Sequence, residues 1–151
     1  MQKVRLLRFI QQLRRLGPVD PIAIAFIATE MRFRGPFLRL GEALHALWSI
    51  YVLRREPKLT LGKCQVSFSY WRRRFGERNI DLLIATFDDV ISYEVCCSYL
   101  KANSRTTLEQ TIIQYNGRPS VLYVKLFYKN LALVASLSAQ ASVKLVVAER
   151  V

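Results

Sequence analysis

The sequence predicts a single, mainly α-helical domain with at most a small β element. Apolar residues recur mostly at the three- and four-residue spacing of helix faces, and Gly-Pro and Asp-Pro pairs separate the segments. No repeat, low-complexity tract or linker divides the 151 residues, which are enough for one sizeable core. We expect three parts within this domain: a basic N-terminal helix over 1–17, a core over 20–135 and a C-terminal segment over 136–151.

The first two helices are expected on either side of the Gly17-Pro18 pair. The apolar face of the first helix is predicted to consist of Val4, Leu7, Ile10 and Leu13. Asp20 before Pro21 is a strong helix start, because aspartate caps the helix and proline suits its first turn. The second helix, PIAIAFIATEMRF, is apolar on nearly all sides and is expected to stop at Gly35-Pro36.

The next segments are less regular. Residues 37–53 suggest a third helix, whose expected core residues are Leu38, Leu44, Leu47, Trp48 and Tyr51. Apolar and polar residues then alternate from Gln65 to Tyr70, which fits either irregular structure or a short strand. A short helix through Phe75, closed by Gly76, is expected after it.

The second half of the chain predicts further helices at about 79–87 and 89–101. The capping-box pattern Thr106-Thr107-Leu108-Glu109 predicts another helix, which continues through about Gln114. Gly117, Pro119 and Ser120 supply a stop, a breaker and a new cap. Tyr115 and Asn116 are therefore expected in a tight corner between two helices.

The bulk charge limits the classes of partner. The chain has 23 Lys and Arg against 11 Asp and Glu, a formal net charge of +12, so it should be attracted to polyanions such as nucleic acid, anionic lipid or acidic cell wall. The apolar run 121–135 is interrupted by lysines and is too short to span a bilayer, so no transmembrane segment is expected. The N-terminus does not resemble a usual secretory signal. The three cysteines are interpreted as small buried residues, and no metal or other cofactor is expected.

Glu30 stands out as the lone acid near the end of an apolar helix. Partial desolvation there should raise the pKa of its carboxyl group, which suits a residue that donates a proton to a leaving oxygen in glycoside cleavage. The catalytic glutamate of lysozyme, which lies in an apolar pocket, is a known case of the same pattern. The alternative is an outward-facing Glu30 paired with Arg32 or Arg34.

Three stretches together carry a family resemblance. IATEMRF resembles the catalytic-glutamate helix of soluble lytic transglycosylases and goose-type lysozymes, LGKCQVS resembles their GLMQ-type segment, and IIQYNGR resembles their AYN-G motif. They occur in the family's order, with Tyr99-Leu100 and Tyr123-Val124 similar to two further family pairs. The likeness covers roughly residues 20–135 and implies a lysozyme-like fold.

The chain also departs from the family pattern. Met31 stands where the family usually has serine, and Lys63-Cys64 replaces a leucine-methionine pair. The interval from Glu30 to Gln65 is longer than in most members and includes the apolar segment around Trp48. These departures bear on substrate positioning more than on the fold.

The resemblance implies a peptidoglycan-degrading enzyme that cleaves the bond between N-acetylmuramic acid and N-acetylglucosamine. It makes Glu30 the catalytic acid and base, most simply as a lytic transglycosylase that forms 1,6-anhydro ends with one carboxylate. Among the substrate-binding residues, Gln65 and Asn116 would hold N-acetyl groups and the sugar ring, and Tyr115 would stack on the sugar while its hydroxyl binds Glu30 or substrate. Tyr123 is assigned to the site by the resemblance and to the core by its position.

Other assignments complete the prediction. Ser67 and Arg118 are expected at the rim of the cleft. A hydrolytic lysozyme of the same fold, a non-enzymatic nucleic-acid-binding module and a membrane-active protein are the alternatives. For the enzyme we expect a monomer that binds peptidoglycan strands and no nucleic acid. It would be made in the bacterial cytoplasm and reach the wall without a signal peptide, as in phage lysis or specialised secretion.

Overall fold

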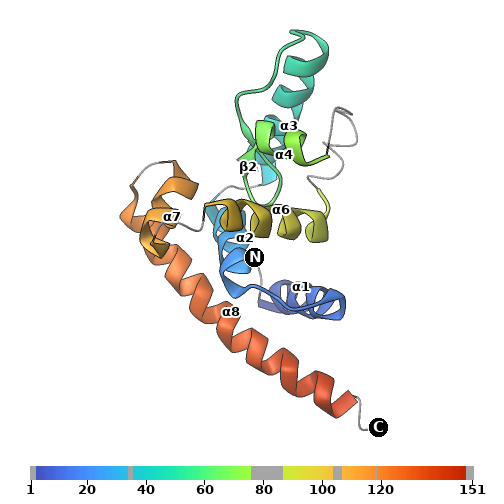
Figure 1. Ribbon diagram of the computed structural model, residues 1–151, viewed down its shortest axis with the longest axis vertical. Helices are drawn as coiled ribbons and strands as arrows, with labels where there is room; N and C mark the ends of the chain where they lie inside the picture. The colour runs from blue at the N-terminus through green and yellow to red at the C-terminus, as the bar shows by residue number, and fades with distance from the viewer. Residues whose placement is uncertain (1–2, 34–35, 76–86, 104–106, 118, 149–151) are drawn as a thin grey trace.

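The computed structural model describes residues 3–33, 36–75, 87–103, 107–117 and 119–148 (Figure 1). The described part is mainly helical with one two-stranded sheet, which confirms the predicted fold class. The predicted helix at 79–87, Gly76 and Arg118 lie wholly or mostly outside these residues. Figure 1 places α3 and α4 at one end of the molecule and the last turns of α8 at the other.

Helix α2 (Pro21–Phe33) lies at the centre of the core. Every residue from Ala23 to Glu30 is buried, because α8 (Val121–Ala148) and α6 (Asp89–Ala102) both pack against α2. The helix begins as predicted, with the Asp20 carboxylate accepting a hydrogen bond of 2.8 Å from the Ile22 amide. Other helices thus cover α2 on most of its sides, which explains why its sequence is apolar on nearly all faces.

Helix α8 meets this core along a regular stripe. Its buried residues follow one another at intervals of four and three: Tyr123, Phe127, Asn130, Val134, Leu137 and Ala141. Asn130 sets the alignment with α2, since it donates to Thr29 Oγ1 at 3.0 Å and accepts from Arg32 at 3.3 Å. The helix runs without a break through residue 135, so the predicted boundary between core and C-terminal segment falls inside α8.

By length and composition alone, residues Val121–Ala141 of α8 could cross a membrane. This candidate span of 21 residues is longer than the apolar run 121–135, which was predicted to be too short for a bilayer. The Tyr123–Ala141 stripe of α8 belongs to the core, and 28% of the candidate window is buried.

Helix α1 (Lys3–Leu16) packs against α8 with a face that agrees with the predicted one in part. Its buried residues are Leu6, Phe9, Ile10 and Leu13. Val4, predicted to be apolar core, is 61% exposed, and Leu7 is only partly buried. Ile10 and Leu13 are buried as predicted, whereas Val4 and Leu7 were chosen in place of Leu6 and Phe9, because both choices have helical spacing.

Helix α3 (Pro36–Tyr51) contradicts most of its predicted core. Leu38, Leu44, Trp48 and Tyr51 are each more than half exposed, and Leu47 is partly buried. The helix instead buries the small residues Ala46 and Ser49. Spacing identified residues that share a face, but not which face meets the rest of the protein.

A short hairpin connects α3 to α4 (Phe68–Phe75). Strands β1 (Thr60–Leu61) and β2 (Val66–Ser67) are antiparallel, with Thr60 opposite Ser67 and Leu61 opposite Val66. Of the two interpretations that the alternating residues allowed, the strand is the correct one. Gln65 in the turn has φ 50°, and its backbone N–H donates to the Gly62 carbonyl at 3.3 Å.

Helices α6 and α7 (Leu108–Asn116) begin at well-formed caps. Asp88 accepts hydrogen bonds of 2.8 Å from two amides in the first turn of α6. The capping box of α7 joins Thr107 to Gln110, so the predicted box was wrong by one residue. Helix α7 ends at Asn116, two residues beyond the predicted end, and Gly117 follows it in the left-handed conformation. The predicted helix–helix corner at Tyr115-Asn116 is therefore present.

Candidate active site

A cavity of about 230 Å³ lies where α2, the hairpin, α6 and α7 meet. Four segments that are distant in sequence line it. The lining residues are Glu30 from α2, Thr60, Gln65, Val66 and Ser67 from the hairpin, Tyr99 from α6, and Gln114, Tyr115, Asn116 and Gly117 from α7 and its cap. The structure thus brings Glu30, Gln65, Ser67, Tyr115 and Asn116 to one place, as the sequence predicted.

Glu30 is the acid of this cavity. The residue is 4% exposed, and the seven residues before it are buried. The Tyr123 hydroxyl donates to Glu30 Oε1 at 2.6 Å, a short hydrogen bond that fixes the carboxyl group. The alternative of an outward-facing Glu30 does not hold, and Arg32 is engaged with Asn130.

Of the two roles predicted for Tyr123, the core position is confirmed, while the structure gives a contact with Glu30 in place of the predicted contact with substrate. Its side chain is 1% exposed and belongs to the core, while its hydroxyl touches the acid of the site. It does not line the cavity, so a direct contact with substrate is not indicated. The packed core fixes the orientation of the Tyr123 ring, and this directs its hydroxyl group toward Glu30.

Tyr115 reaches the cavity from the end of α7, but its hydroxyl has a different partner from the predicted one. It donates to the Cys64 carbonyl and lies 3.6 Å from Cys96 Sγ. One face of the ring stacks on Phe26, with centroids 4.3 Å apart, and Tyr99 meets it edge-on at 5.5 Å. These contacts tie α7 to α2 and α6, so Tyr115 forms a wall of the cavity rather than an open platform for a sugar.

Burial sets the protonation of this region. It raises the pKa of the Tyr115 hydroxyl well above its usual value, and the neighbouring thiols Cys96 and Cys64 add to the rise. Burial likewise raises the pKa of the Cys96 thiol. Both shifts favour the neutral forms of Tyr115 and Cys96 at physiological pH. The three cysteines are free thiols; Cys64 and Cys96 are buried as predicted, and Cys97 is partly exposed.

Gln65 lies in the cavity wall with its amide group engaged within the protein. Its Nε2 donates to the Gly62 carbonyl at 2.9 Å and to the Glu42 carboxylate at 3.2 Å, while its Oε1 accepts from Thr60 at 2.7 Å. The predicted role of holding an N-acetyl group therefore needs a change: both protons of the amide are already directed to protein acceptors. Gln65 instead fixes the hairpin turn and the Thr60 side chain.

Asn116 and Ser67 are the more accessible polar residues of the cavity. Both are partly buried, and Ser67 Oγ lies 3.2 Å from Ser69 Oγ. Asn116 is the last residue of α7, where Gly117 turns the chain away at φ 74°. This turn presents the Asn116 amide at the cavity, as the corner predicted from the sequence requires.

Sequence reasoning did not assign Thr60, Val66, Gln114 or Gly117 to substrate contact. Gln114 and Gly117 belong to the IIQYNGR motif, so their position next to Tyr115 and Asn116 could have assigned them to the cavity. Tyr99 is indicated by the sequence only as part of a family pair. Thr60 carried no sequence signal, because its place depends on pairing with Ser67 in a two-residue strand.

Among the described residues that line the cavity, Glu30 is the one carboxylic acid. Glu42 lies behind the lining, where it accepts a hydrogen bond from Gln65. Three other acids have roles elsewhere: Glu56 pairs with Arg72, Asp88 caps α6 and Asp89 pairs with Lys63. Glu94 and Glu109 are exposed, and Asp81 lies outside the described residues. The cavity therefore offers a single proton-transfer group next to amide and hydroxyl side chains.

No family model, curated protein or solved structure matches this chain.

Proposed function

We propose that this protein is a peptidoglycan-degrading enzyme, a lytic transglycosylase with Glu30 as its acid and base. The observation that carries the proposal is the buried Glu30 carboxyl group in a polar cavity, held by the Tyr123 hydroxyl at 2.6 Å. A carboxyl group so removed from water can keep a proton for a leaving oxygen. The motif resemblance and its order along the chain supply the substrate class.

The proposed reaction needs one carboxyl group. Glu30 gives its proton to the oxygen that links N-acetylmuramic acid to N-acetylglucosamine, and the bond from that oxygen to the muramoyl anomeric carbon breaks. The Glu30 carboxylate then takes the proton of the muramoyl 6-hydroxyl, whose oxygen bonds to the same carbon. The product is a 1,6-anhydro end, and no water is consumed.

The lining favours this route over two-carboxylate hydrolysis. Such hydrolysis uses a second acid about 5–9.5 Å from the first, whereas Glu30 is the one acid among the described lining residues. The alternative is hydrolysis by an enzyme of the same fold, which would give reducing ends instead of 1,6-anhydro ends. The cavity is smaller than the roughly 300–1,000 Å³ of common ligand sites, so it suits the one sugar ring at the cleaved bond.

The other lining residues would orient that ring. Asn116 and Ser67, which line the cavity, would hydrogen-bond its amide and hydroxyl groups. Tyr115 and Gln65 would shape the cavity through their contacts with Phe26, Thr60 and Gly62. Rigid support of this kind keeps catalytic groups within the narrow geometry that the reaction requires.

Glu30→Gln is the first test. Glutamine cannot donate the proton but keeps an oxygen for Tyr123, so we expect glycan cleavage to be lost while thermal stability stays at or above that of the wild type. Purified sacculi are incubated with each protein, and the soluble products are identified by mass spectrometry. Anhydro ends support the proposal and reducing ends indicate a hydrolase.

Glu109→Gln is the matched control, because Glu109 is exposed and does not line the cavity. Its activity should equal that of the wild type. Intact sacculi with the wild-type protein, or a Glu30→Gln variant within about tenfold of the wild-type rate, would rule the proposal out.

A further inference from the structure

Helix α3 presents an exposed apolar stripe to solvent. The residues follow one another at spacings of three and four and are each more than half exposed: Phe37, Leu40, Leu44, Trp48 and Tyr51. Such spacing places them on one side of the helix, opposite the buried Ala46 and Ser49. Phe37 is 89% exposed, an unusual position for a phenylalanine. A stripe of this size marks a contact surface.

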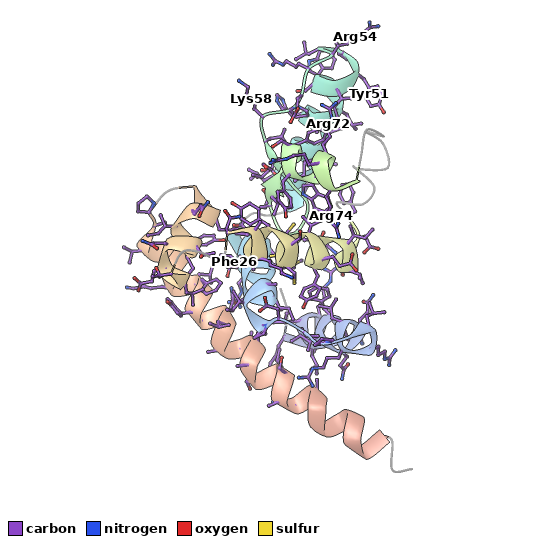
Figure 2. All side chains as sticks on the ribbon, in the orientation of Figure 1. Phe26, Tyr51, Arg54, Lys58, Arg72 and Arg74 are labelled. Atoms are coloured by element: carbon purple, nitrogen blue, oxygen red, sulfur yellow. The ribbon has the colours of Figure 1, made fainter. Side chains whose placement is uncertain are left out.

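Basic residues surround the end of this stripe. Figure 2 shows Tyr51, Arg54 and Lys58 at the same end of the molecule, with Lys58 on the opposite side of this end from Tyr51 in the view and Arg72 below them. Arg54, Arg55 and Lys58 are all exposed. Residues 36–75 carry eight Lys and Arg against two Glu, a net of +6 out of the chain's +12.

The two acids of this region are engaged. Glu42 accepts a hydrogen bond from Gln65, and Glu56 pairs with Arg72 at 3.3 Å. The electrostatic potential at the end of α3 is thus positive. The apolar stripe beside it consists of aromatic and leucine side chains. An exposed apolar stripe with tryptophan and tyrosine beside arginine and lysine is the composition of helices that lie in the interface of an anionic bilayer.

We propose that α3 docks this protein on an anionic lipid surface. The stripe from Phe37 to Tyr51 enters the boundary between headgroups and acyl chains, while Arg54, Arg55 and Lys58 contact lipid phosphates. The attraction of the positive tip for anionic lipid distinguishes this occupant from a second copy of the chain, which would bring two positive tips together. The docking is separate from glycan cleavage and does not depend on it.

Trp48 provides a direct signal. The chain has two tryptophans, and Trp71 is fully buried, so a change in emission on lipid binding comes from the exposed Trp48. Vesicles of equal phosphatidylglycerol and phosphatidylcholine are titrated into the full-length protein in moderate salt. We expect a blue shift, absent in Trp48→Phe, and binding at least tenfold tighter than to phosphatidylcholine alone.

Paired variants separate the stripe from exposed apolar surface in general. Phe37→Ser with Leu44→Ser should weaken binding to the anionic vesicles by tenfold or more, measured by vesicle co-sedimentation. Val121→Ser with Leu122→Ser removes two similarly exposed side chains at the start of α8 and should change it less than twofold. Equal losses in the two pairs would overturn the proposal.

A second pair of variants tests the cations. Arg54→Gln, Arg55→Gln and Lys58→Gln together should weaken binding by about fivefold for each charge removed. Three exposed arginines on α1 serve as the control, Arg5→Gln, Arg8→Gln and Arg15→Gln, and their joint effect should stay below threefold. Equal losses in both triple variants would show attraction by net charge alone and overturn docking through α3.

Two further outcomes would also overturn it. One is an absence of binding to anionic vesicles by the wild-type protein. The other is a dimer in sedimentation equilibrium that Phe37→Ser with Leu44→Ser converts to monomer, without vesicle binding by either form; this would assign the stripe to a second copy. Because neither experiment contains peptidoglycan, their results are independent of the proposed enzymatic activity.

Discussion

At the scale of single residues, Glu30 owes its position to a residue far along the chain. Tyr123 stands 93 residues away, yet its hydroxyl holds the Glu30 carboxyl group at 2.6 Å within the buried core. A buried carboxyl group without such a donor would lose a hydrogen bond that water cannot replace there. Tyr123 is thus a positioning residue, important for both the stability of the core and the orientation of the acid.

Tyr123→Phe tests this role. The variant keeps the ring but removes the donor, so we expect the free energy of unfolding to fall by about 1–3 kcal/mol and the rate of glycan cleavage to fall as Glu30 loses its fixed orientation. Urea unfolding followed by circular dichroism measures the first effect. Tyr128→Phe on the exposed side of the same helix should change stability by less than about 0.5 kcal/mol; similar losses in both variants would contradict the assigned role.

The partly buried phenol of Tyr115 is expected to make stability sensitive to alkaline pH. Its pKa is raised in the folded protein, whereas in the unfolded chain it ionises near the ordinary value of about 10. Its contribution is therefore complete below about pH 10 and is lost as pH rises above that value, because only the unfolded state then releases the proton. Tyr115→Phe should flatten the fall of unfolding free energy between about pH 10 and 11.5.

Urea titrations at several pH values provide the measurement. Burial also raises the pKa of Tyr99, so the slope of the variant should remain different from zero. Tyr51→Phe is the control, since Tyr51 is more than half exposed and its removal should leave the slope unchanged. An identical pH slope for wild type and Tyr115→Phe would contradict the buried position of this hydroxyl.

At the scale of elements, the end of α7 sets the position of Tyr115 and Asn116. Gly117 has φ 74°, a conformation that costs other residues about 1–2 kcal/mol. A Cβ atom added at Gly117 would meet no atom within 4 Å, so the cost of alanine there comes from the backbone alone. The same lack of contact holds at Gly41 within α3, where the backbone is helical.

Replacing each of these two glycines by alanine should change the free energy of unfolding in opposite directions. Gly117→Ala should lower the free energy of unfolding by about 1–2 kcal/mol, and Gly41→Ala should raise it by about 0.5–1 kcal/mol, because alanine favours a helix interior. Thermal unfolding of both variants against the wild type checks the pair. Gly117→Ala should also slow cleavage, as it displaces Asn116; stability changes of the same sign would show that the corner differs from the one described.

Which elements the sequence could predict depends on whether neighbours along the chain determine them. The start of α2, the cap of α7 and the corner at Gly117 follow from local residue types, and they were predicted to within a residue or two. The exposed face of α3 was not, because periodicity groups Leu44, Trp48 and Tyr51 without saying what covers them. The hairpin was only one of two interpretations, since each strand has two residues.

The candidate site divides in the same way. Glu30, Gln65, Tyr115 and Asn116 could be indicated by residue type and motif, and they do line one cavity. Their bonding partners could not be predicted, because each depends on contacts between distant segments: Tyr123 with Glu30, Tyr115 with Cys64, and Gln65 with Glu42. Thr60 enters the cavity for the same reason, through its pairing with Ser67.

At the scale of the whole molecule, the net charge of +12 should oppose compact folding. Like charges repel across the surface, and the ion pairs among the described residues include Lys63 with Asp89 and Arg72 with Glu56. Sodium chloride screens this repulsion, with a Debye length of about 30 Å at 0.01 M and 8 Å at 0.15 M. The loss of two partly exposed pairs weighs less than the relief of repulsion.

We therefore expect the melting temperature to rise by a few degrees between low salt and about 0.15 M sodium chloride. Differential scanning calorimetry measures the change. Replacing Arg72, Arg73 and Arg74 together by glutamine lowers the charge and should reduce this dependence. A melting temperature that falls with salt would mean that attractive pairs, rather than repulsion, dominate the surface.

The bond between Glu30 and Tyr123 also has a consequence for synthesis of the chain. Glu30 leaves the ribosome before its hydroxyl partner, which is made 93 residues later and belongs to α8. A growing chain that has not yet released α8 cannot form the pair, however complete its first helices are. Truncation before residue 123 should consequently yield a protein without an ordered acid, so the arrangement at Glu30 exists only in chains that extend beyond Tyr123.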